Sequence, residues 1–147
     1  MADTYTNLLV HIVFSTKNRE PLITPTLRPE MEKYLGGILR NEGSALLEIG
    51  TMPDHVHLLV KLRPDASVSE SVRVLKANSS KWANDRFPGF AWQNGYGAFS
   101  VSESQIEAIR GYLRRQEEHH RGVTFQQEYV AFLQRHGIEF QEAYVWG

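Results

Sequence analysis

The chain has 147 residues, of which 41% are hydrophobic and 22% charged, and this composition suits one globular domain spanning residues 1–147. It contains no cysteine, which excludes disulfides, thiolate metal sites and a cysteine nucleophile. The formal net charge of −1 shows no global basic surplus, so any surface that binds nucleic acid must be positive only locally.

The N-terminal half predicts a strand, a helix and then a hairpin. Residues 6–14 are mostly apolar and β-branched, which is typical of a buried strand. Residues 27–41 carry apolar side chains at spacings of three and four, which predicts an amphipathic helix. Residues 45–51 and 55–62 predict two more strands, and the Pro-Asp pair between them favours an antiparallel hairpin.

The C-terminal half predicts three helices and one strand. A helix is expected over residues 67–86, and a fourth strand over residues 96–101 follows a loop rich in glycine, proline and aromatic residues. A further helix is expected over residues 102–120, and a last one over residues 125–135. The helices at 67–86 and 102–120 both open on a capping-box pattern, Ser followed by Glu or Gln three residues later.

This order of elements predicts an α+β fold. It matches a ferredoxin-like or RRM-like βαββαβ antiparallel sheet with helices on one face and an added C-terminal helix. The opposite face is expected to stay partly open, and nucleic-acid modules with this plan bind there. We divide the domain into a core of about residues 5–120 and a C-terminal helical extension of about residues 121–147.

Two histidines on the third predicted strand form a candidate metal site. His55 and His57 are two residues apart, so their side chains point to the same face of the strand. Two neighbouring imidazoles can chelate a divalent cation, and Asp54 could orient one of them. The alternative is a pair of polar side chains on a half-exposed strand.

The helix at residues 102–120 supplies a candidate nucleophile. Tyr112 and Gln116 are four residues apart and therefore share one helical face. A phenol can form a covalent intermediate, and an amide oxygen is a reasonable third metal ligand. The alternative is that Tyr112 simply packs beside the apolar stripe.

Two helical segments carry a local positive charge that suits contact with phosphates. The residues expected to contact DNA are Arg73, Lys76, Ser79, Ser80, Lys81, Arg110, Arg114 and Arg115. The alternative for each segment is an ordinary solvated helix face.

Taken together in this order, these segments resemble the single-tyrosine HUH transposases of the insertion-sequence (IS200-like) type, which move through single-stranded DNA. The segments that carry the resemblance are TNLLVHIVFSTKNREPLI, MPDHVHLLV, SVSESVRVLKANSSKWANDRFP, WQNGYGAFSVS and IRGYLRRQEEHH. They extend over almost the whole chain.

The resemblance implies the chemistry. His55 and His57 would be metal ligands, Gln116 would complete the metal site, and Tyr112 would be the nucleophile. The family's cofactor is Mg²⁺ or Mn²⁺, although two imidazoles alone would favour a softer metal such as Zn²⁺. The enzyme would cut and rejoin single-stranded DNA at hairpin-marked element ends through a 5′-phosphotyrosine, without a nucleotide cofactor.

The resemblance also implies an obligate homodimer in which strands of two subunits join into one sheet. Residues 6–14 are apolar and are expected to offer an unprotected edge for such pairing. The sequence shows neither a signal peptide nor a membrane span, so we expect a cytoplasmic, nucleoid-associated protein without a membrane partner.

Three alternatives remain open. Domesticated relatives act on repeated extragenic palindromes, although residues 124–147 resemble the insertion-sequence branch more. A non-catalytic nucleic-acid-binding module would carry aromatic residues where the central strand has His55 and His57. A metal-dependent hydrolase would use water as its nucleophile and would need no tyrosine.

Overall fold

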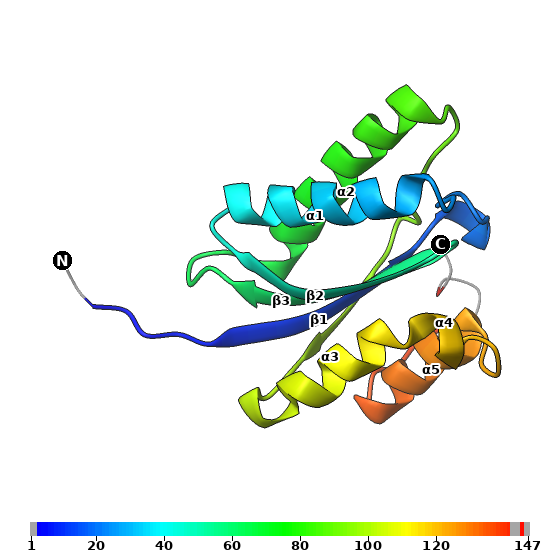
Figure 1. Ribbon diagram of the computed structural model, residues 1–147. Helices are drawn as coiled ribbons and strands as arrows, with labels where there is room; N and C mark the ends of the chain where they lie inside the picture. The colour runs from blue at the N-terminus through cyan, green and yellow to red at the C-terminus, as the bar shows by residue number, and fades with distance from the viewer. Residues whose placement is uncertain (1–2, 142–144, 146–147) are drawn as a thin grey trace.

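A computed structural model describes residues 3–141 and 145 and shows a four-stranded antiparallel sheet with helices on both of its faces (Figure 1). The strands are β1 (Leu8–Ser15), β2 (Ala45–Met52), β3 (His55–Leu62) and β4 (Gly97–Ser100). Their order in the sheet is β2-β3-β1-β4, and each neighbouring pair is antiparallel. The predicted α+β class and its βαββαβ core are confirmed.

The main hydrophobic core lies between one face of the sheet and two helices, α1 (Leu27–Asn41) and α2 (Val68–Arg86). Val56 and Leu58 of β3 point into this core and are fully buried. Because side chains alternate along a strand, their neighbours must point to the opposite face. The packing of α1 and α2 therefore fixes the direction of the two histidines.

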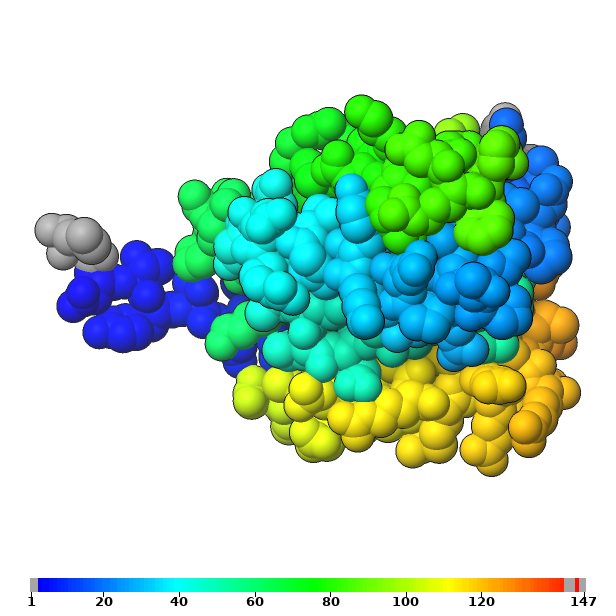
Figure 2. Space-filling model, turned by 45° about the horizontal axis from the view of Figure 1, so that its top comes forward, coloured from blue at the N-terminus to red at the C-terminus, as the bar shows by residue number. Residues whose placement is uncertain are grey.

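The opposite face of the sheet is covered, which corrects the expectation that it stays partly open. The covering elements are η2 (Glu103–Gln105), α3 (Ile106–Arg114), α4 (Gln116–His119) and α5 (Phe125–Arg135). Figures 1 and 2 show α1 and α2 on one side of the molecule and the yellow α3 on the other. The apolar stripe of α5 buries Phe125 and Phe132 in a second cluster with Val13 and Phe99 of the sheet, and this burial holds the helix in place.

The strand at the N-terminus is internal, so the expectation of an unprotected edge over residues 6–14 is wrong. β1 pairs with β3 on one side and with β4 on the other. The edges of the sheet are β2 and β4 instead. Residues 3–7 precede β1 as an arm that projects from the body (Figures 1 and 2). The Tyr5 side chain in this arm is 89% exposed.

The single helix expected over residues 102–120 is divided. Its first turn is the 3-10 segment η2, and the chain leaves helical geometry again at Arg115, where φ is −101° and ψ is 22°. Ser102 makes no capping hydrogen bond to this helix, and its hydroxyl lies 3.1 Å from that of Ser104. By contrast, Ser67 does cap α2 and accepts a hydrogen bond from the backbone N–H of Glu70 at 3.1 Å.

Two glycines allow the covering helices to approach the sheet closely. A Cβ atom on Gly50 of β2 would lie 2.5 Å from the carbonyl oxygen of Leu113 in α3. A Cβ atom on Gly97 of β4 would lie 2.7 Å from the ring of Tyr129 in α5. Glycine at both positions therefore brings α3 and α5 within reach of the histidines. No helix in the described part of the chain is both long and apolar enough to cross a membrane.

Candidate metal and nucleophile site

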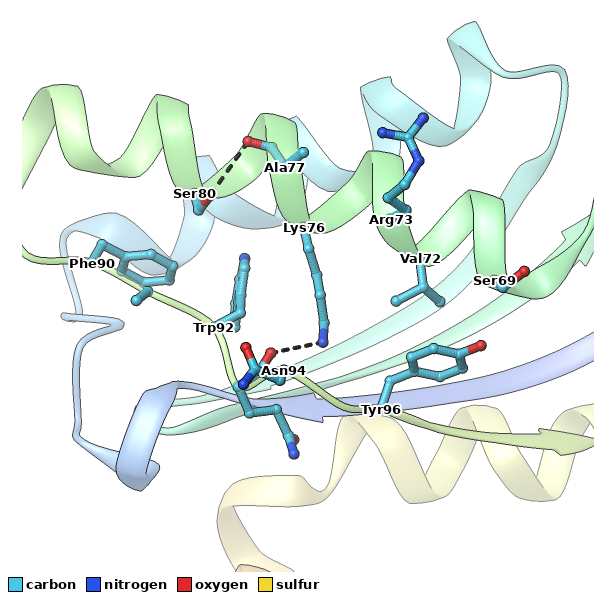
Figure 3. A pocket seen from close by; sticks show the side chains of 12 residues that line it. Ser69, Val72, Arg73, Lys76, Ala77, Ser80, Phe90, Trp92, Asn94 and Tyr96 are labelled. Atoms are coloured by element: carbon cyan, nitrogen blue, oxygen red, sulfur yellow. Dashed lines mark hydrogen bonds between the residues drawn. The ribbon is translucent and has the colours of Figure 1, made fainter. Parts of the chain in front are cut away.

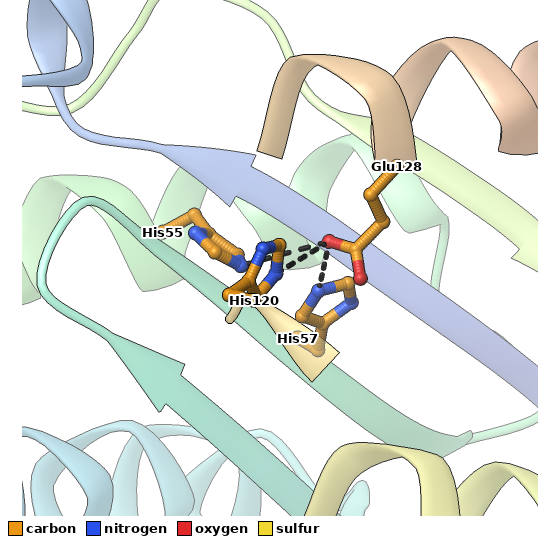
Figure 4. A group of neighbouring side chains, drawn as sticks. All are labelled: His55, His57, His120 and Glu128. Carbon is orange, nitrogen blue, oxygen red and sulfur yellow. Dashed lines mark hydrogen bonds and ion pairs between the residues drawn. The ribbon is translucent and has the colours of Figure 1, made fainter. Parts of the chain in front are cut away.

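Three imidazoles converge in the space between β3 and the covering helices. His55 and His57 project from β3 and are 1% and 0% exposed, and His120 follows α4. Figure 4 shows these rings grouped around the carboxylate of Glu128, which extends from α5. The candidate ligand atoms of these four residues all lie within 4.8 Å of one another.

An outer partner fixes the orientation of each ring. Nδ1 of His55 lies 2.7 Å from Oδ1 of Asp54, which is the carboxylate expected to orient it. Nδ1 of His57 lies 2.8 Å from Nε2 of the buried His11, and Nδ1 of His120 donates to the carbonyl of Val123 at 2.6 Å. These bonds turn every Nε2 atom toward the centre, as outer-sphere partners do around metal-binding histidines.

The Glu128 carboxylate occupies the centre of the cluster. Its Oε1 atom lies 2.8 Å from Nε2 of His57, 3.3 Å from Nε2 of His120 and 3.6 Å from Nε2 of His55. Burial would raise the pKa of this carboxyl, but hydrogen bonds from His120 and His57 hold it well below its usual range. Burial lowers the pKa of His57 to about 4 against the opposing effect of Glu128, so at neutral pH this ring is neutral and its nitrogen can bind a metal.

Gln116, the predicted third ligand, is also in the cluster. Its side chain is 1% exposed, and its Oε1 atom lies 3.3 Å from Nε2 of His55 and 3.1 Å from Nε2 of His120. Gln116 begins α4, immediately after the break at Arg115.

The donor spacing fits a divalent cation. Two ligands held at about 2.1 Å from one ion, at tetrahedral or octahedral angles, lie about 3.0–3.4 Å apart. The separations from the Glu128 oxygen to the three imidazole nitrogens range from 2.8 to 3.6 Å. One ion could therefore replace these direct contacts with little movement of the surrounding chain.

Tyr112 lies beside this cluster. Its hydroxyl donates to Oε2 of Glu128 and lies 3.3 Å from Nε2 of His119, and its ring centroid is 5.8 Å from that of His57. Burial and the charge of Glu128 raise the pKa of Tyr112, so the phenol is protonated in this arrangement. The tyrosine also borders a surface hollow of about 410 Å³, lined in addition by Arg115, Glu118 and His119. A ligand at the surface can therefore approach the tyrosine.

One residue expected to contact DNA lies in the interior. Ser79 is 0% exposed, its hydroxyl donates to the carbonyl of Leu75, and it accepts a hydrogen bond from the indole of Trp92 at 2.9 Å. The prediction for Ser79 is wrong, because a hydroxyl buried by helix packing cannot reach a phosphate. Ser80 is half-buried, and Lys81 is exposed on the same helix.

Several of the other expected DNA contacts already have protein partners. Arg73 forms an ion pair with Glu70, at 2.5 Å, and Arg114 forms one with Glu48, at 2.8 Å. Arg110 donates to the carbonyl of Leu47 at 2.8 Å. Arg115 is exposed beside the hollow at Tyr112.

Lys76 lines a groove between α2 and the segment that leads into β4 (Figure 3). The groove has a volume of about 480 Å³, and Trp92 and Tyr96 form part of its wall. The Lys76 ammonium donates to the carbonyl of Gln93 at 2.9 Å, and burial lowers its pKa to about 8. Lys76 therefore holds the segment before β4 against α2. Its ammonium is half-buried and only partly available to bind a ligand.

Sequence reasoning did not identify Glu128, His11 or the role of His120. A signal for Glu128 was present, since a carboxylate stands between Phe125, Tyr129 and the other apolar residues of the buried face of α5. A charge on an apolar stripe is rarely buried unless it has a partner. His11 and His120 carry no such pattern, and only the fold brings them to the site.

The comparisons with known proteins agree with this fold. The architecture is that of transposases, enzymes that cut DNA and join it to new ends. The sequence model of the family described as Transposase IS200 like matches residues 4–116, and the chain belongs to this family. The match ends at Gln116, so the His120 and Glu128 positions lie beyond it.

Curated relatives and solved structures support the family. The chain is 25% identical to the ISDra2 transposase TnpA of Deinococcus radiodurans over 116 residues, which are 74% of this chain and 83% of the relative. It is 28% identical to the IS200 transposase of Salmonella typhimurium over 130 residues, 80% of this chain and 82% of the relative.

Two solved structures share the fold. A crystal structure of a protein assigned as a transposase, from Deinococcus radiodurans R1, has a TM-score of 0.65 and 26% identity, covering 79% of this chain and 95% of that one. A REP-associated tyrosine transposase bound to a REP hairpin has a TM-score of 0.63, covering 84% of this chain and 74% of that one. At 15% identity, the second likeness concerns the fold alone.

Proposed function

We propose that this transposase cleaves and rejoins single-stranded DNA at hairpin-marked ends through a 5′-phosphotyrosine on Tyr112. The observation that carries the proposal is the position of the Tyr112 hydroxyl. It contacts the Glu128 carboxylate, whose other oxygen lies 2.8 Å from His57. The proposed nucleophile therefore lies next to the proposed metal donors of the same chain, at the edge of a hollow open to the surface.

His55, His57 and Gln116 are the residues we propose to hold Mg²⁺ or Mn²⁺, and their donor spacing fits such an ion. When bound, the ion supplies positive charge that stabilises the negative charge developing on the scissile phosphate. Asp54 and His11 keep the two imidazoles of β3 in place through their Nδ1 atoms.

Tyr112 forms the covalent bond in this proposal. As the phenol oxygen bonds to phosphorus, the bond from phosphorus to the 3′ oxygen breaks and leaves a 3′-hydroxyl. The phenol proton, which Glu128 now accepts in a hydrogen bond, leaves the tyrosine, and the departing 3′ oxygen takes up a proton. A second 3′-hydroxyl reverses the step, joins the new ends and restores Tyr112.

The DNA is proposed to approach through the hollow beside Tyr112. Arg115 lies on its rim, and Lys81 presents a further exposed cation on α2. The relative bound to a REP hairpin has the same fold, which supports a hairpin as the shape of the DNA ligand. A domesticated role on palindromic repeats would use this same chemistry, and hairpins found at the ends of one mobile element would favour the insertion-sequence role.

We further propose that the protein is a homodimer. The edge strands β2 and β4 are where a second sheet could add, since β1 is internal. The projecting arm with the exposed Tyr5 offers additional surface for a second copy. A cytoplasmic, nucleoid-associated location follows from the proposed DNA substrate, and the reaction needs no nucleotide cofactor.

The test is formation of a covalent adduct. The chain is incubated with a single-stranded hairpin DNA and Mn²⁺, and a protein–DNA adduct is sought on a denaturing gel. We expect an adduct with the wild type and with the control Tyr34→Phe, a tyrosine of α1, and none with Tyr112→Phe or with a chelator. Cleavage without an adduct would favour the hydrolase, whereas hairpin binding without cleavage would favour a non-catalytic module.

A further inference from the structure

We propose that His120 and Glu128, from the segment beyond the family match, are themselves metal ligands. They would extend the His55, His57 and Gln116 set to five donors and make the centre bind Mn²⁺ more tightly than Mg²⁺. This inference rests on the metal centre of the proposed function. It goes further because it assigns ligands to residues outside the part of the chain that the family model matches.

The positions of the donor atoms carry the inference. Nε2 of His120 lies 3.1 Å from Oε1 of Gln116 and 3.3 Å from Oε1 of Glu128. Both separations fall within the range expected for two ligands that share one ion. Because Nδ1 of His120 donates to the carbonyl of Val123, the Nε2 atom is the one that remains to face the centre.

The burial of Glu128 is the second observation. The residue is 3% exposed, and an ionised carboxylate removed from water needs a compensating charge. Within the part of the chain that the structure describes, its ion-pair partners are all histidines: His55, His57, His119 and His120. A divalent cation held between the carboxylate and these imidazoles would supply the compensating charge.

The fold positions Glu128 with little freedom. A complete capping box between Thr124 and Gln127 starts α5. The helix packs closely on β4, where the Tyr129 ring lies against Gly97. Phe125, one turn before Glu128, stacks on the ring of His55 with centroids 4.2 Å apart. These contacts set the position of Glu128 before any ion is bound.

The donor types determine the expected preference. Mg²⁺ favours oxygen ligands and keeps several waters, whereas imidazole nitrogen suits transition metals. Three imidazoles with one carboxylate and one amide oxygen therefore favour Mn²⁺ over Mg²⁺.

The test measures metal binding in the absence of DNA. Mn²⁺ affinity is determined by calorimetry on the purified full chain, together with competition by Mg²⁺. We expect Glu128→Gln and His120→Ala each to weaken Mn²⁺ binding at least about tenfold, since even outer-sphere partners affect affinity by this much. Glu117→Gln, an exposed carboxylate on α4, is the matched control and should bind as the wild type does. Unchanged affinity in either ligand variant, or Mg²⁺ binding as tight as Mn²⁺, overturns the inference.

A second measurement requires no variant and therefore does not depend on folding of a mutant. Pulsed electron paramagnetic resonance of Mn²⁺ bound to the wild type should show coupling to three imidazole nitrogens, and coupling to only two would overturn the set of three histidine ligands. Failure of the proposed function is seen separately. A wild type that forms no DNA adduct but binds Mn²⁺ through Glu128 refutes the reaction and leaves the metal ligands standing.

Discussion

The Tyr112 hydroxyl donates a hydrogen bond to the carboxylate of Glu128, and this bond joins the two parts of the molecule. Tyr112 lies within the segment that the family model matches, whereas Glu128 belongs to the helix that follows it. The other carboxylate oxygen contacts the imidazole of His57. The last helix therefore connects the candidate nucleophile to the candidate metal ligands, and it is part of the site.

The close packing at Gly50 should be essential to the site. In Gly50→Ala, the new methyl group would lie 2.5 Å from the Leu113 carbonyl and would push α3 away, and with it Tyr112. We expect a loss of about 1–3 kcal/mol in the free energy of unfolding, measured in urea, and weaker Mn²⁺ binding. The control is Gly37→Ala in α1, where a Cβ meets nothing within 4 Å and alanine should be neutral or slightly stabilising. Equal stability of the two variants would contradict this view of Gly50.

Ser79 should matter for folding and not for DNA binding. Ser79→Ala leaves the indole N–H of Trp92 buried without its acceptor, which costs about 1–3 kcal/mol in the free energy of unfolding. Chemical denaturation measures this loss, and hairpin affinity measured under native conditions should be unchanged. Ser80→Ala, one residue along α2, is the control for stability. A Ser79→Ala protein of wild-type stability with weakened DNA binding would restore the original expectation for this residue.

Lys76 should make stability depend on pH. Its pKa of about 8 in the folded protein lies below the ordinary 10.5, so between these values the unfolded chain holds a proton that the folded chain has lost. Stability therefore rises as pH increases through this window, and the penalty for the half-buried charge is fully present below pH 8.

Lys76→Met removes this dependence. Unfolding in urea at pH 7 and pH 9.5 should show the stability of the wild type relative to Lys76→Met rising by about 1 kcal/mol, after allowance for solvent screening. The exposed Lys81→Met is the control, and its difference from the wild type should stay the same at both pH values. If the difference in free energy of unfolding between the wild type and Lys76→Met is also the same at both pH values, the Lys76 ammonium is better solvated than its half-buried position implies.

Two exposed cations, Arg115 beside the hollow and Lys81 on α2, should dominate the salt dependence of DNA binding. Lys81→Ala and Arg115→Ala should each weaken hairpin binding and reduce the slope of log affinity against log salt by about 0.7–0.9 for every phosphate that the variant no longer neutralises. Lys61→Ala is the control, because Lys61 lies six residues along β3 from His55, about 20 Å away. A slope altered by Lys61→Ala alone would place the DNA at the other end of the sheet.

Local patterns predicted most of the elements. The bounds of α1, β3 and α5 agree with the predicted ranges, because the periods of 3.6 and 2 residues and the turn residues are properties of neighbouring side chains. The same alternation placed His55 and His57 on one face of the strand, as the structure shows. The position of Tyr112 beside them was expected from the family resemblance and is not readable from helix periodicity.

The failures concern contacts between distant parts of the chain. The sequence of β1 is apolar because neighbouring strands and layers enclose it, but the same pattern would suit an exposed edge strand. The hydroxyl of Ser79 reads as polar surface until Trp92 packs against α2. The break at Arg115 also has no clear sequence signal, since no proline or glycine interrupts the helix there.

By itself, the sequence determined most of the strands and helices, which face of β3 carries the histidines, and the family to which the chain belongs. Only the tertiary structure decided that α3, α4 and α5 close the second face of the sheet and bring His11, His120 and Glu128 to that place. The reason is that periodicity reports which side of an element avoids water, whereas the partner that covers this side is chosen by packing over the whole chain. The metal cluster is a product of that packing.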